Sequence, residues 1–431
     1  MLLNRVLVNR ADRRRFTPRI ALLATAALVA GLAGTPSAAA TPINAAGSAA
    51  ASSTAAGAHW SGVWASGQQG LVDAGPFTDT TLRLLISPTQ GGSTLRIRLA
   101  NTFGSHALRI DGASVAVVTT IGQPGLVPGS SRALRFHGQP RVTLDQGARV
   151  RSDAVRLPFR YGQTLAVDLY LADSGAGPVT GHASSGQSSF FATGDHRGQV
   201  SGASFTGNLS SWYYLDGVDV QPATAHGSVV ALGDSITDGA YAAWNGNRRW
   251  PDVLAARLQQ LPPVQRRGVL NQGIGGNRVL AYRGDCCGTS ESAIDRLERD
   301  VLTQTGVRTL IIADGINDLG YHSTAPELIA GLTTLTTRAK QAGLRVVIAT
   351  VTPYGCDSGC FGPDQEADRQ RVNTWIRTSS VPDAVADFDA AVADPQHPDR
   401  LAASFDAGDH LHLNDTGYAA LANAVDLRSL G

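Results

Sequence analysis

Two hydrophobic patterns follow each other along the chain. Between residues 59 and 222, short segments such as residues 94–99 and 164–171 alternate polar with apolar positions, and turns rich in Gly, Pro, Asn, Asp and Ser separate them. A period of two residues predicts strands with one buried face. Because the segments are many and short, and no long helical stretch interrupts them, we expect residues 59–222 to form an all-β domain of the sandwich or jelly-roll type.

After residue 222 the period changes. Continuous apolar runs, which are typical of strands buried on both faces, alternate with longer segments of helical periodicity. This alternation predicts a parallel sheet with helices on both faces, in a second domain that begins near residues 222–228 and covers residues 227–431. Its strands are expected at residues 229–232, 269–271, 308–313, 345–351 and 384–387, and its helices near residues 250–261, 291–302, 326–342, 364–378 and 415–425.

The first 40 residues have the layout of a secretory signal peptide. Six arginines precede an apolar stretch at residues 20–33, and the alanines at residues 38–40 offer a cleavage site. About 20 apolar residues are needed to cross a membrane, so this shorter stretch argues against a stable membrane anchor. The sequence predicts a secreted, extracellular protein that starts at or soon after Thr41, with a disordered linker at residues 41–58. Arg13 and Arg14 leave twin-arginine export open as an alternative route.

Charge and composition restrict the partners. The chain has 43% hydrophobic and 16% charged residues, which fits a soluble globular protein. Without residues 1–40, which hold six arginines and one aspartate, it has 30 basic and 34 acidic residues and a net charge of −4. No basic block remains in this sequence that would bind nucleic acid. We therefore expect no nucleic-acid partner. We also expect a monomer.

The four cysteines form two close pairs, Cys286 with Cys287 and Cys356 with Cys360. An even number of cysteines in an exported chain favours disulfides over the rival zinc site, because neither pair has the C-x-x-C spacing. Two arrangements fit: a local Cys356–Cys360 bond with Cys286 and Cys287 either joined or free, or two bonds that tie one loop to the other. Because adjacent cysteines rarely bond to each other, the sequence favours the cross-link between the loops.

Polar residues and glycine collect where the predicted strands of the second domain end. Ser235 follows the first strand, Gly276 lies in the loop after the second, and Asn317 follows the third. Asp409 and His412 precede the last helix. The carboxyl ends of parallel strands lie at one edge of a sheet, which is where open α/β sheets bind ligands. We therefore expect these five residues at one site.

The residue types of this set fit nucleophilic catalysis. A serine needs a base to take its proton, and a histidine in that role needs an acceptor for its second nitrogen. Asp409 lies three residues before His412 and is preferred to Asp406 as this acceptor. Each short motif alone also fits an ordinary turn or helix cap, whereas their order along the chain favours catalysis. The expected oxyanion donors are the backbone N–H groups of Ser235 and Gly276 and the side-chain amide of Asn317.

These motifs resemble those of the GDSL or SGNH hydrolases, whose second name matches Ser235, Gly276, Asn317 and His412. The family's first block is similar to Gly-Asp-Ser-Ile-Thr at residues 233–237. The resemblance covers residues 227–431 and implies a flavodoxin-like three-layer α/β/α domain with serine-esterase chemistry that needs no metal or cofactor. A β domain before such a core resembles the arrangement of certain secreted bacterial carbohydrate esterases.

The predicted function is that of a secreted serine esterase that cleaves short-chain acyl or acetyl esters, with acetylated polysaccharide as a candidate substrate. Two alternatives stay open. One is a lipase or thioesterase of the same family that acts on longer acyl chains. The other is a polysaccharide-binding protein with a vestigial hydrolase half, for which Trp212, Tyr213 and Tyr214 are the candidate binding residues. The favoured interpretation places these three aromatic residues in a core or an interface.

Overall fold

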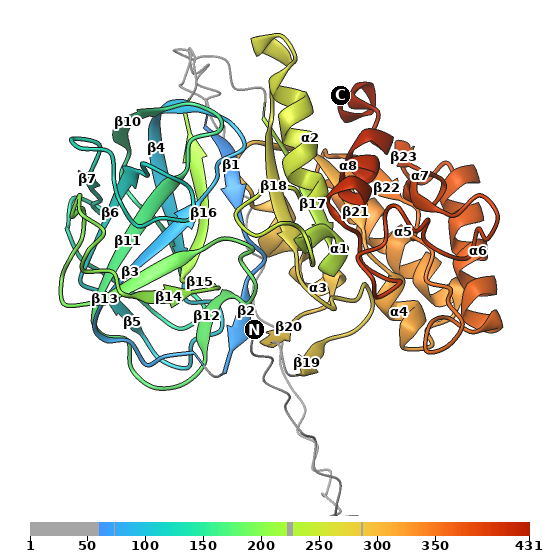
Figure 1. The fold of residues 1–431 in the computed structure, drawn as a ribbon, viewed down its shortest axis with the longest axis horizontal. Helices are drawn as coiled ribbons and strands as arrows, with labels where there is room; N and C mark the ends of the chain where they lie inside the picture. Colours follow the sequence, from blue (N-terminus) through green and yellow to red (C-terminus); the bar gives the residue numbers. More distant parts are fainter. Residues whose placement is uncertain (1–59, 73, 222–226, 286–287) are drawn as a thin grey trace, which may run out of the picture. The chain divides into compact units, whose positions relative to one another are not determined.

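The computed structural model describes residues 60–72, 74–221, 227–285 and 288–431. Figure 1 shows antiparallel strands in the N-terminal part of these residues and a parallel sheet covered by helices in the C-terminal part. The predicted signal peptide, the predicted linker, Cys286 and Cys287 lie outside the described residues. Within the described part of the chain, no helix is long and apolar enough to cross a membrane.

Two antiparallel sheets of the N-terminal part share one core. In the first sheet, β3 (Thr78–Ile86) pairs with β11 (Leu165–Asp173), which pairs with β6 (Gly112–Val117). The second sheet has the order β1-β16-β4-β10, and its apolar residues pack against those of the first. The predicted all-β N-terminal part is therefore confirmed. The remaining strands are β1 (Ser61–Ala65), β2 (Gln69–Leu71), β4 (Gly92–Ala100), β5 (Leu108–Ile110), β7 (Arg132–Ala133), β8 (Val142–Leu144), β9 (Arg149–Arg151), β10 (Val155–Phe159), β12 (Val179–His182), β13 (Ser189–Thr193), β14 (Gly207–Leu209), β15 (Trp212–Tyr213) and β16 (Leu215–Val220).

The aromatic residues considered for polysaccharide binding belong to this core. Trp212 and Tyr214 are each 3% exposed, and the indole N–H of Trp212 donates to the carbonyl of Leu85 at 2.8 Å. Tyr213 is half-buried, and its ring centroid lies 5.0 Å from that of Phe77. Buried rings of this kind hold the sheets together and present no flat face to a sugar. The interpretation of Trp212 and Tyr214 as exposed binding residues is therefore wrong.

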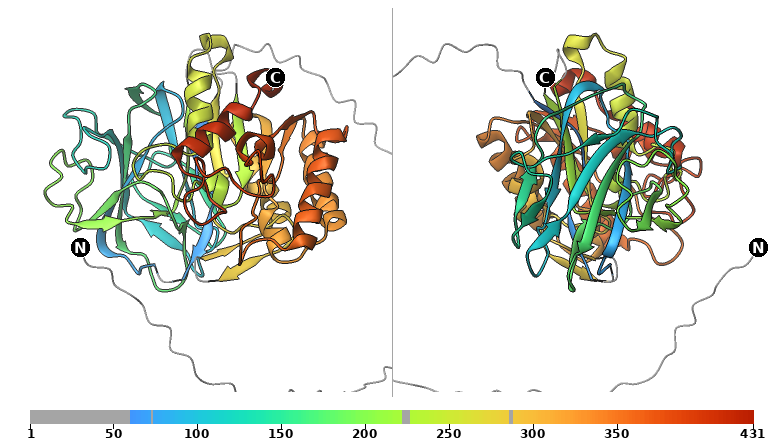
Figure 2. Two further views of the ribbon diagram at one scale, coloured as in Figure 1. Left: turned by 45° about the vertical axis from the view of Figure 1, so that its right-hand side comes forward. Right: turned by 90° about the vertical axis from the view of Figure 1, so that its left-hand side faces the viewer.

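The C-terminal part contains a five-stranded parallel sheet in the order β18-β17-β21-β22-β23. The helices α2 and α7 pack against α8, whereas α3, α5, α4 and α6 pack among themselves, so helices cover both faces (Figures 1 and 2). The strand order is that of the flavodoxin-like fold, as expected. The strands are β17 (Ser228–Gly233), β18 (Gly268–Gly273), β21 (Val307–Ala313), β22 (Arg345–Ala349) and β23 (Ala384–Ala386), with a hairpin of β19 (Arg283–Asp285) and β20 (Gly288–Ser290). The helices are α1 (Ser235–Asp238), α2 (Trp250–Gln259), α3 (Ala293–Leu297), α4 (Ile316–Gly320), α5 (Ala325–Gln341), α6 (Pro363–Thr378), α7 (Phe388–Val392) and α8 (Asp415–Ala424), with short turns at η1 (Pro263–Gln265), η2 (Glu298–Leu302) and η3 (Leu427–Leu430).

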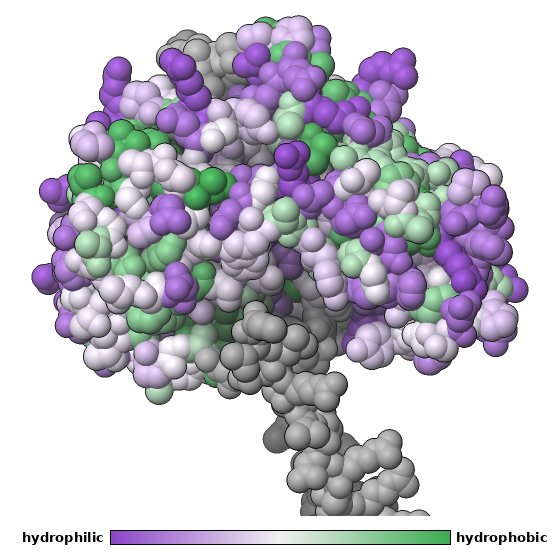
Figure 3. Space-filling model, in the orientation of Figure 1, coloured by the Kyte–Doolittle hydropathy of each residue, from purple (hydrophilic) through white to green (hydrophobic). Residues whose placement is uncertain are grey.

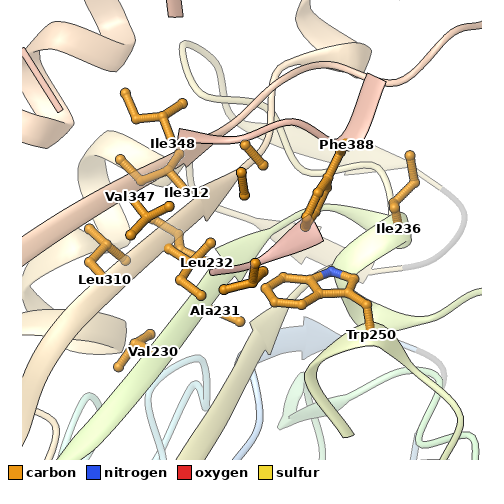
Figure 4. Packing of buried hydrophobic residues seen from close by; sticks show 14 of the residues in the cluster. Val230, Ala231, Leu232, Ile236, Trp250, Leu310, Ile312, Val347, Ile348 and Phe388 are labelled. Carbon is orange, nitrogen blue, oxygen red and sulfur yellow. The ribbon is translucent and has the colours of Figure 1, made fainter. Parts of the chain in front are cut away.

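Apolar side chains on both faces of this sheet make the core of the C-terminal part (Figure 4). Leu232, Leu310 and Val347 come from adjacent strands and are completely buried. Full burial of such a side chain contributes roughly 1.5–3 kcal/mol to folding. The rings of Trp250 and Phe388 close one face, with centroids 5.4 Å apart. This packing makes the sheet a rigid base for the loops that follow its strands.

Close contacts join the two parts. The N–H of Gly62 in β1 donates to the carbonyl of Thr305 at 2.9 Å, and a Cβ at Gly268 would lie only 2.1 Å from the carbonyl oxygen of Gly62. All described residues belong to one compact unit. The predicted boundary near residues 222–228 falls between β16 and β17, and the division into two domains stays a prediction.

A disulfide joins Cys356 to Cys360, whose Cα atoms lie 5.6 Å apart. This bond corrects the favoured expectation of two bonds between the 286–287 and 356–360 loops. A loop that returns within four residues brings the two Cα atoms into the range that a disulfide can bridge. The local arrangement, which was the other possibility considered, is the one present.

Candidate active site

Ser235 lies at the carboxyl end of β17, which pairs with β18 and β21, and it begins α1. The turn between them leaves no room for a side chain at Gly233, because a Cβ there would lie 2.2 Å from the carbonyl oxygen of Ala313. Asp234 caps α1 by accepting the N–H of Ile236 at 2.9 Å. The hydroxyl of Ser235 is thereby held on a short, capped turn above the sheet.

A continuous line of hydrogen bonds runs from this serine through a histidine to a carboxylate. Nε2 of His412 lies 2.8 Å from Oγ of Ser235, and Nδ1 of His412 lies 2.6 Å from Oδ2 of Asp409. The other carboxylate oxygen of Asp409 accepts the backbone N–H of His412 at 2.8 Å. Burial would raise the pKa of Asp409, but these hydrogen bonds outweigh it and hold the pKa below its usual value. Asp409 is therefore ionised at neutral pH and fixes which way the imidazole faces.

Asp406, the other carboxylate considered, points to a different histidine. Its Oδ2 lies 2.8 Å from Nδ1 of His410, and its Oδ1 accepts the backbone N–H of Gly408 at 2.7 Å. Asp406 therefore holds the turn before His412, and among the described residues its carboxylate contacts the ring of His410 and not that of His412.

The loops after β18 and β21 bring Gly276 and Asn317 to the same cleft as Ser235 and His412. Gly276 has a φ of 70°, a left-handed conformation that glycine adopts without strain. The side-chain amide of Asn317 donates to the carbonyl of Asn277 at 3.0 Å, which fixes the amide plane. Asp318 fixes the loop that carries Gly276, because its two carboxylate oxygens accept the backbone N–H groups of Val279 and Leu280, which follow that loop. The structure thus brings all five sequence-predicted residues together.

This cleft has a volume of about 500 Å³, and both parts of the chain line it. The N-terminal part contributes Gln69 and the loop that contains Ala183, Ser184 and Gly186. Sequence reasoning missed these residues, because a short run of small residues after a strand is ordinary turn composition. Their role depends on the packing of segments far apart in the sequence.

Two large aromatic side chains remain exposed where the cleft opens. Tyr241 is 64% exposed and Trp244 is 48% exposed, and both line the cleft. The ring of Tyr241 lies 5.4 Å from the ring of His412, and its φ of 65° is unusual for a residue other than glycine. The indole N–H of Trp244 donates to Oγ of Ser188 at 2.9 Å, which holds the ring in place.

A buried histidine of the N-terminal part contacts the helix that begins at Ser235. In His182, which is 2% exposed, Nδ1 lies 2.8 Å from the carbonyl oxygen of Gly67 and Nε2 lies 2.9 Å from Oδ1 of Asp238. A carbonyl can only accept, so Nδ1 must carry a proton; an ionised Asp238 also only accepts, so Nε2 must carry a second. Burial lowers the pKa of His182, but the charge of Asp238 and the hydrogen bonds raise it above its usual value, so His182 is an imidazolium paired with the Asp238 carboxylate.

The carboxylates behind Ser235 form a second buried group. Burial raises the pKa of Asp234 to about 7, and burial together with the Asp234 charge raises the pKa of Asp314 well above its usual value. The buried guanidinium of Arg296 opposes both shifts and donates to the carbonyl of Gly233 at 2.9 Å. Asp234 and Arg296 therefore hold the turn that carries Ser235, through the N–H of Ile236 and the carbonyl of Gly233.

The C-terminal part of the chain, which contains Ser235 and His412, matches a known protein family. Residues 231–420 match the GDSL-like Lipase/Acylhydrolase family. No curated protein matches the chain. Solved structures with a similar fold include the aryl esterase of M. smegmatis (18% identity, TM-score 0.38, 47% of this chain and 99% of that one) and a carbohydrate acetylesterase from Sinorhizobium meliloti (18% identity, TM-score 0.36, 46% and 95%). An acetylxylan esterase from Geobacillus stearothermophilus is 24% identical, with a TM-score of 0.35 and coverage of 47% and 94%. The C-terminal part of the chain, residues 231–420, is therefore a domain of the GDSL-like lipase/acylhydrolase family.

Proposed function

We propose that this chain is a secreted serine esterase that cleaves carboxylic esters through an acyl-enzyme. The observation that carries the proposal is the unbroken line of contacts from Ser235 through His412 to Asp409. A serine hydroxyl is a weak nucleophile until a base within hydrogen-bond distance takes its proton, and His412 is within that distance.

In the proposed reaction, His412 takes the proton of Ser235 as its Oγ attacks the ester carbonyl. The carbonyl oxygen becomes an oxyanion, and the alcohol leaves with the proton held by His412. Water then attacks the acyl-enzyme by the same route and releases the acid. Asp409 stabilises the imidazolium that forms in each half-reaction, because it is ionised and hydrogen-bonded to Nδ1.

The oxyanion is held by the backbone N–H groups of Ser235 and Gly276 and by Asn317. An amide nitrogen has two hydrogens, and the contact with Asn277 uses one of those on Asn317. The second hydrogen is available to the substrate. Because the Asn317 side chain is fixed before substrate binds, it stabilises the developing charge without reorganising.

Asn317→Ala is expected to lower kcat by about 10²- to 10³-fold, the usual scale for the loss of one oxyanion donor. KM should change little, because the amide contacts the charge that develops in the transition state. Steady-state kinetics with p-nitrophenyl acetate measure both constants. Asn208→Ala, on the exposed strand β14, is the matched control and should behave as wild type. A loss smaller than tenfold in Asn317→Ala would argue against this role.

We propose that the acyl group is short, with acetate as the first candidate, and that the alcohol is a sugar of an acetylated polysaccharide. The exposed rings of Tyr241 and Trp244 support the sugar, because aromatic faces at the mouth of a cleft bind the apolar faces of flat ligands. A panel of p-nitrophenyl esters from acetate to palmitate tests the acyl length. A maximum at long chains would favour a lipase, and faster cleavage of a matched thioester would favour a thioesterase.

Trp244→Ala should lower kcat/KM on acetylated xylan by about three- to tenfold, since an aromatic contact is worth roughly 0.5–1.5 kcal/mol. Activity on p-nitrophenyl acetate should stay close to that of wild type, because the small ester has no sugar to contact the ring. Tyr161→Ala removes an exposed aromatic residue outside the cleft and serves as the control. Equal effects on both substrates would contradict a role in binding the alcohol.

We propose export and action as a monomer. On the face shown in Figure 3, hydrophobic residues are scattered among hydrophilic ones, which supports a surface exposed to water. The N-terminus of protein recovered from culture medium is expected at or soon after Thr41, as Edman sequencing or intact mass would measure. Full-length chain found only in the cell fraction would contradict export, and light scattering after size exclusion tests the monomer.

A further inference from the structure

A second cavity, of about 430 Å³, shares no lining residue with the cleft that contains Ser235. Its lining includes Arg98 of β4, Arg149 and Arg151 of β9, Asp216 of β16 and Thr303, which follows η2. We call it the arginine pocket. The pairing of β4 with β9 places Arg98 opposite Arg151, which is why arginines from two strands meet there.

Positive charge exceeds negative charge around the arginine pocket. Asp216 is used by Arg149, whose Nη2 lies 2.7 Å from Oδ2 of the carboxylate. The neighbouring carboxylate, Asp219, forms an ion pair with Arg96, whose Nε lies 2.8 Å from Oδ2 of Asp219. Two aspartates therefore face four arginines. Nε of Arg98 lies 3.5 Å from Oδ1 of Asp219 and 3.9 Å from Oδ2 of Asp216, so Arg98 shares both carboxylates with Arg96 and Arg149, and no described residue forms an ion pair with Arg151.

The buried guanidinium of Arg98 is left with unused donors. Arg98 is 2% exposed, and its Nη2 donates to Oε1 of Gln304 at 2.7 Å. Its Nε and Nη1 have no hydrogen-bond partner in the part of the chain that the structure describes, and its nearest carboxylate oxygen is 3.5 Å from Nε. A buried charge with unused donors is costly, because the water that would satisfy it has been removed.

Arg151 provides an accessible cation beside this buried one. It lies on the exposed side of β9, and no described residue forms a hydrogen bond or ion pair with its guanidinium. Partial burial and then the charge of Arg96 lower its pKa, as expected for a cation among other cations. An anion near Arg151 would relieve this repulsion.

We propose that the arginine pocket binds a tetrahedral oxyanion, a phosphate or sulfate group, through Arg98 and Arg151. The planar guanidinium presents paired N–H donors that match two oxygens of such a group, and its charge strengthens each hydrogen bond. The site is independent of the proposed esterase reaction. It gives the N-terminal part a binding function separate from its contribution to the cleft.

Isothermal titration of the full chain with sodium sulfate and with sodium phosphate, against sodium chloride at equal ionic strength, tests this proposal. We expect saturable binding of one ion per chain for at least one of the two anions. Binding of phosphate alone would assign the site to phosphate groups, and binding of both would assign it to tetrahedral oxyanions in general. Arg151→Gln should weaken binding by about 10- to 100-fold, the range for a hydrogen bond to a charged group.

Arg151→Lys keeps the charge but removes the paired donors, and it should fall between wild type and Arg151→Gln. The matched control is Arg160→Gln, which removes the same charge from an exposed turn outside the pocket and should bind as wild type does. Hydrolysis of p-nitrophenyl acetate by Arg151→Gln should be unchanged, which shows that the variant is folded. The proposal is overturned if neither anion binds saturably, or if Arg151→Gln and Arg160→Gln bind with the affinity of wild type.

Discussion

Replacing Ser235 by alanine should abolish ester hydrolysis, with a fall in kcat of about 10⁴- to 10⁶-fold, the scale seen when a member of such a triad is removed. The change deletes one half-buried hydroxyl at the start of α1, so the fold should remain. His412→Ala should have nearly the same effect, because the base has no function without the nucleophile. The double variant should be barely slower than either single one. Kinetics with p-nitrophenyl acetate, alongside circular dichroism, measure both parts of the prediction.

Ser184→Ala is the matched control for this experiment. It also removes a serine hydroxyl from the cleft, but from the loop supplied by the N-terminal part. Its kcat should stay within a few-fold of wild type. Asp409→Asn should impair the enzyme far more than Asp406→Asn, because Asp409 lies 2.6 Å from the His412 ring, whereas Asp406 contacts His410. Substantial turnover by Ser235→Ala, or the reverse order of the two aspartate variants, would contradict the proposed mechanism.

His182→Phe should destabilise the protein by about 3–5 kcal/mol, the range for removing one partner of a buried ion pair. The substitution leaves Asp238, whose side chain is 12% exposed, without the cation that it contacts. Asp238 ends the helix that Ser235 begins, so kcat should fall as well. Urea denaturation followed by tryptophan fluorescence measures the free energy of unfolding, and steady-state kinetics separate the effects on kcat and KM.

A second substitution makes the His182 prediction specific. Asp238→Asn should be milder than His182→Phe, because the asparagine can donate to a neutral His182 while Nδ1 still donates to the carbonyl of Gly67. The double variant should be more stable than His182→Phe, since it leaves no unpaired buried charge. If the double variant is less stable than His182→Phe alone, the loss comes from packing and not from the charge.

The same pair makes stability depend on pH. Burial lowers the pKa of His182, but the charge of Asp238 and the hydrogen bonds to Asp238 and Gly67 outweigh both burial and Arg249, so that the pKa is raised above 6.5. A histidine with a raised pKa stabilises the fold fully below its unfolded value, and this contribution is lost as the pH rises through the folded pKa. The wild type should therefore lose stability above pH 6.5, a dependence that His182→Phe should lack.

The order of secondary structure could be predicted from the sequence, because local patterns encode it. The alternating segments predicted at residues 94–99 and 164–171 fall on β4 and β11, and the apolar run predicted at residues 229–232 falls on β17. The short helices α1, α4 and α7 were not predicted, since four or five residues are too few to show a period. Even so, the rule that parallel strands end at one edge of a sheet was enough to predict that Ser235 and Asn317 lie at one site. The structure adds that they follow adjacent strands, because β17 pairs with β21.

The same kind of reasoning failed for the cysteines. The sequence favoured a bond between the two cysteine-containing loops, but the distance between Cα atoms decides which cysteines can join. That distance depends on how the loop at residues 356–360 turns, and no periodic pattern describes such a turn. The bond between Cys356 and Cys360 therefore became known only from the structure.

The sequence by itself determined the fold class, the family resemblance and the candidate residues Ser235, Gly276, Asn317, Asp409 and His412, because each lies beside a strand or helix whose pattern is local. Only the tertiary structure decided what surrounds them. His182 contacts Asp238, which lies 56 residues further along the chain. The cleft wall at Ala183 and Ser184 likewise faces Ser235, which is also about 50 residues away in the sequence. No local pattern encodes such pairs, because they arise when the hydrophobic faces of both parts pack and bring polar residues between them into contact.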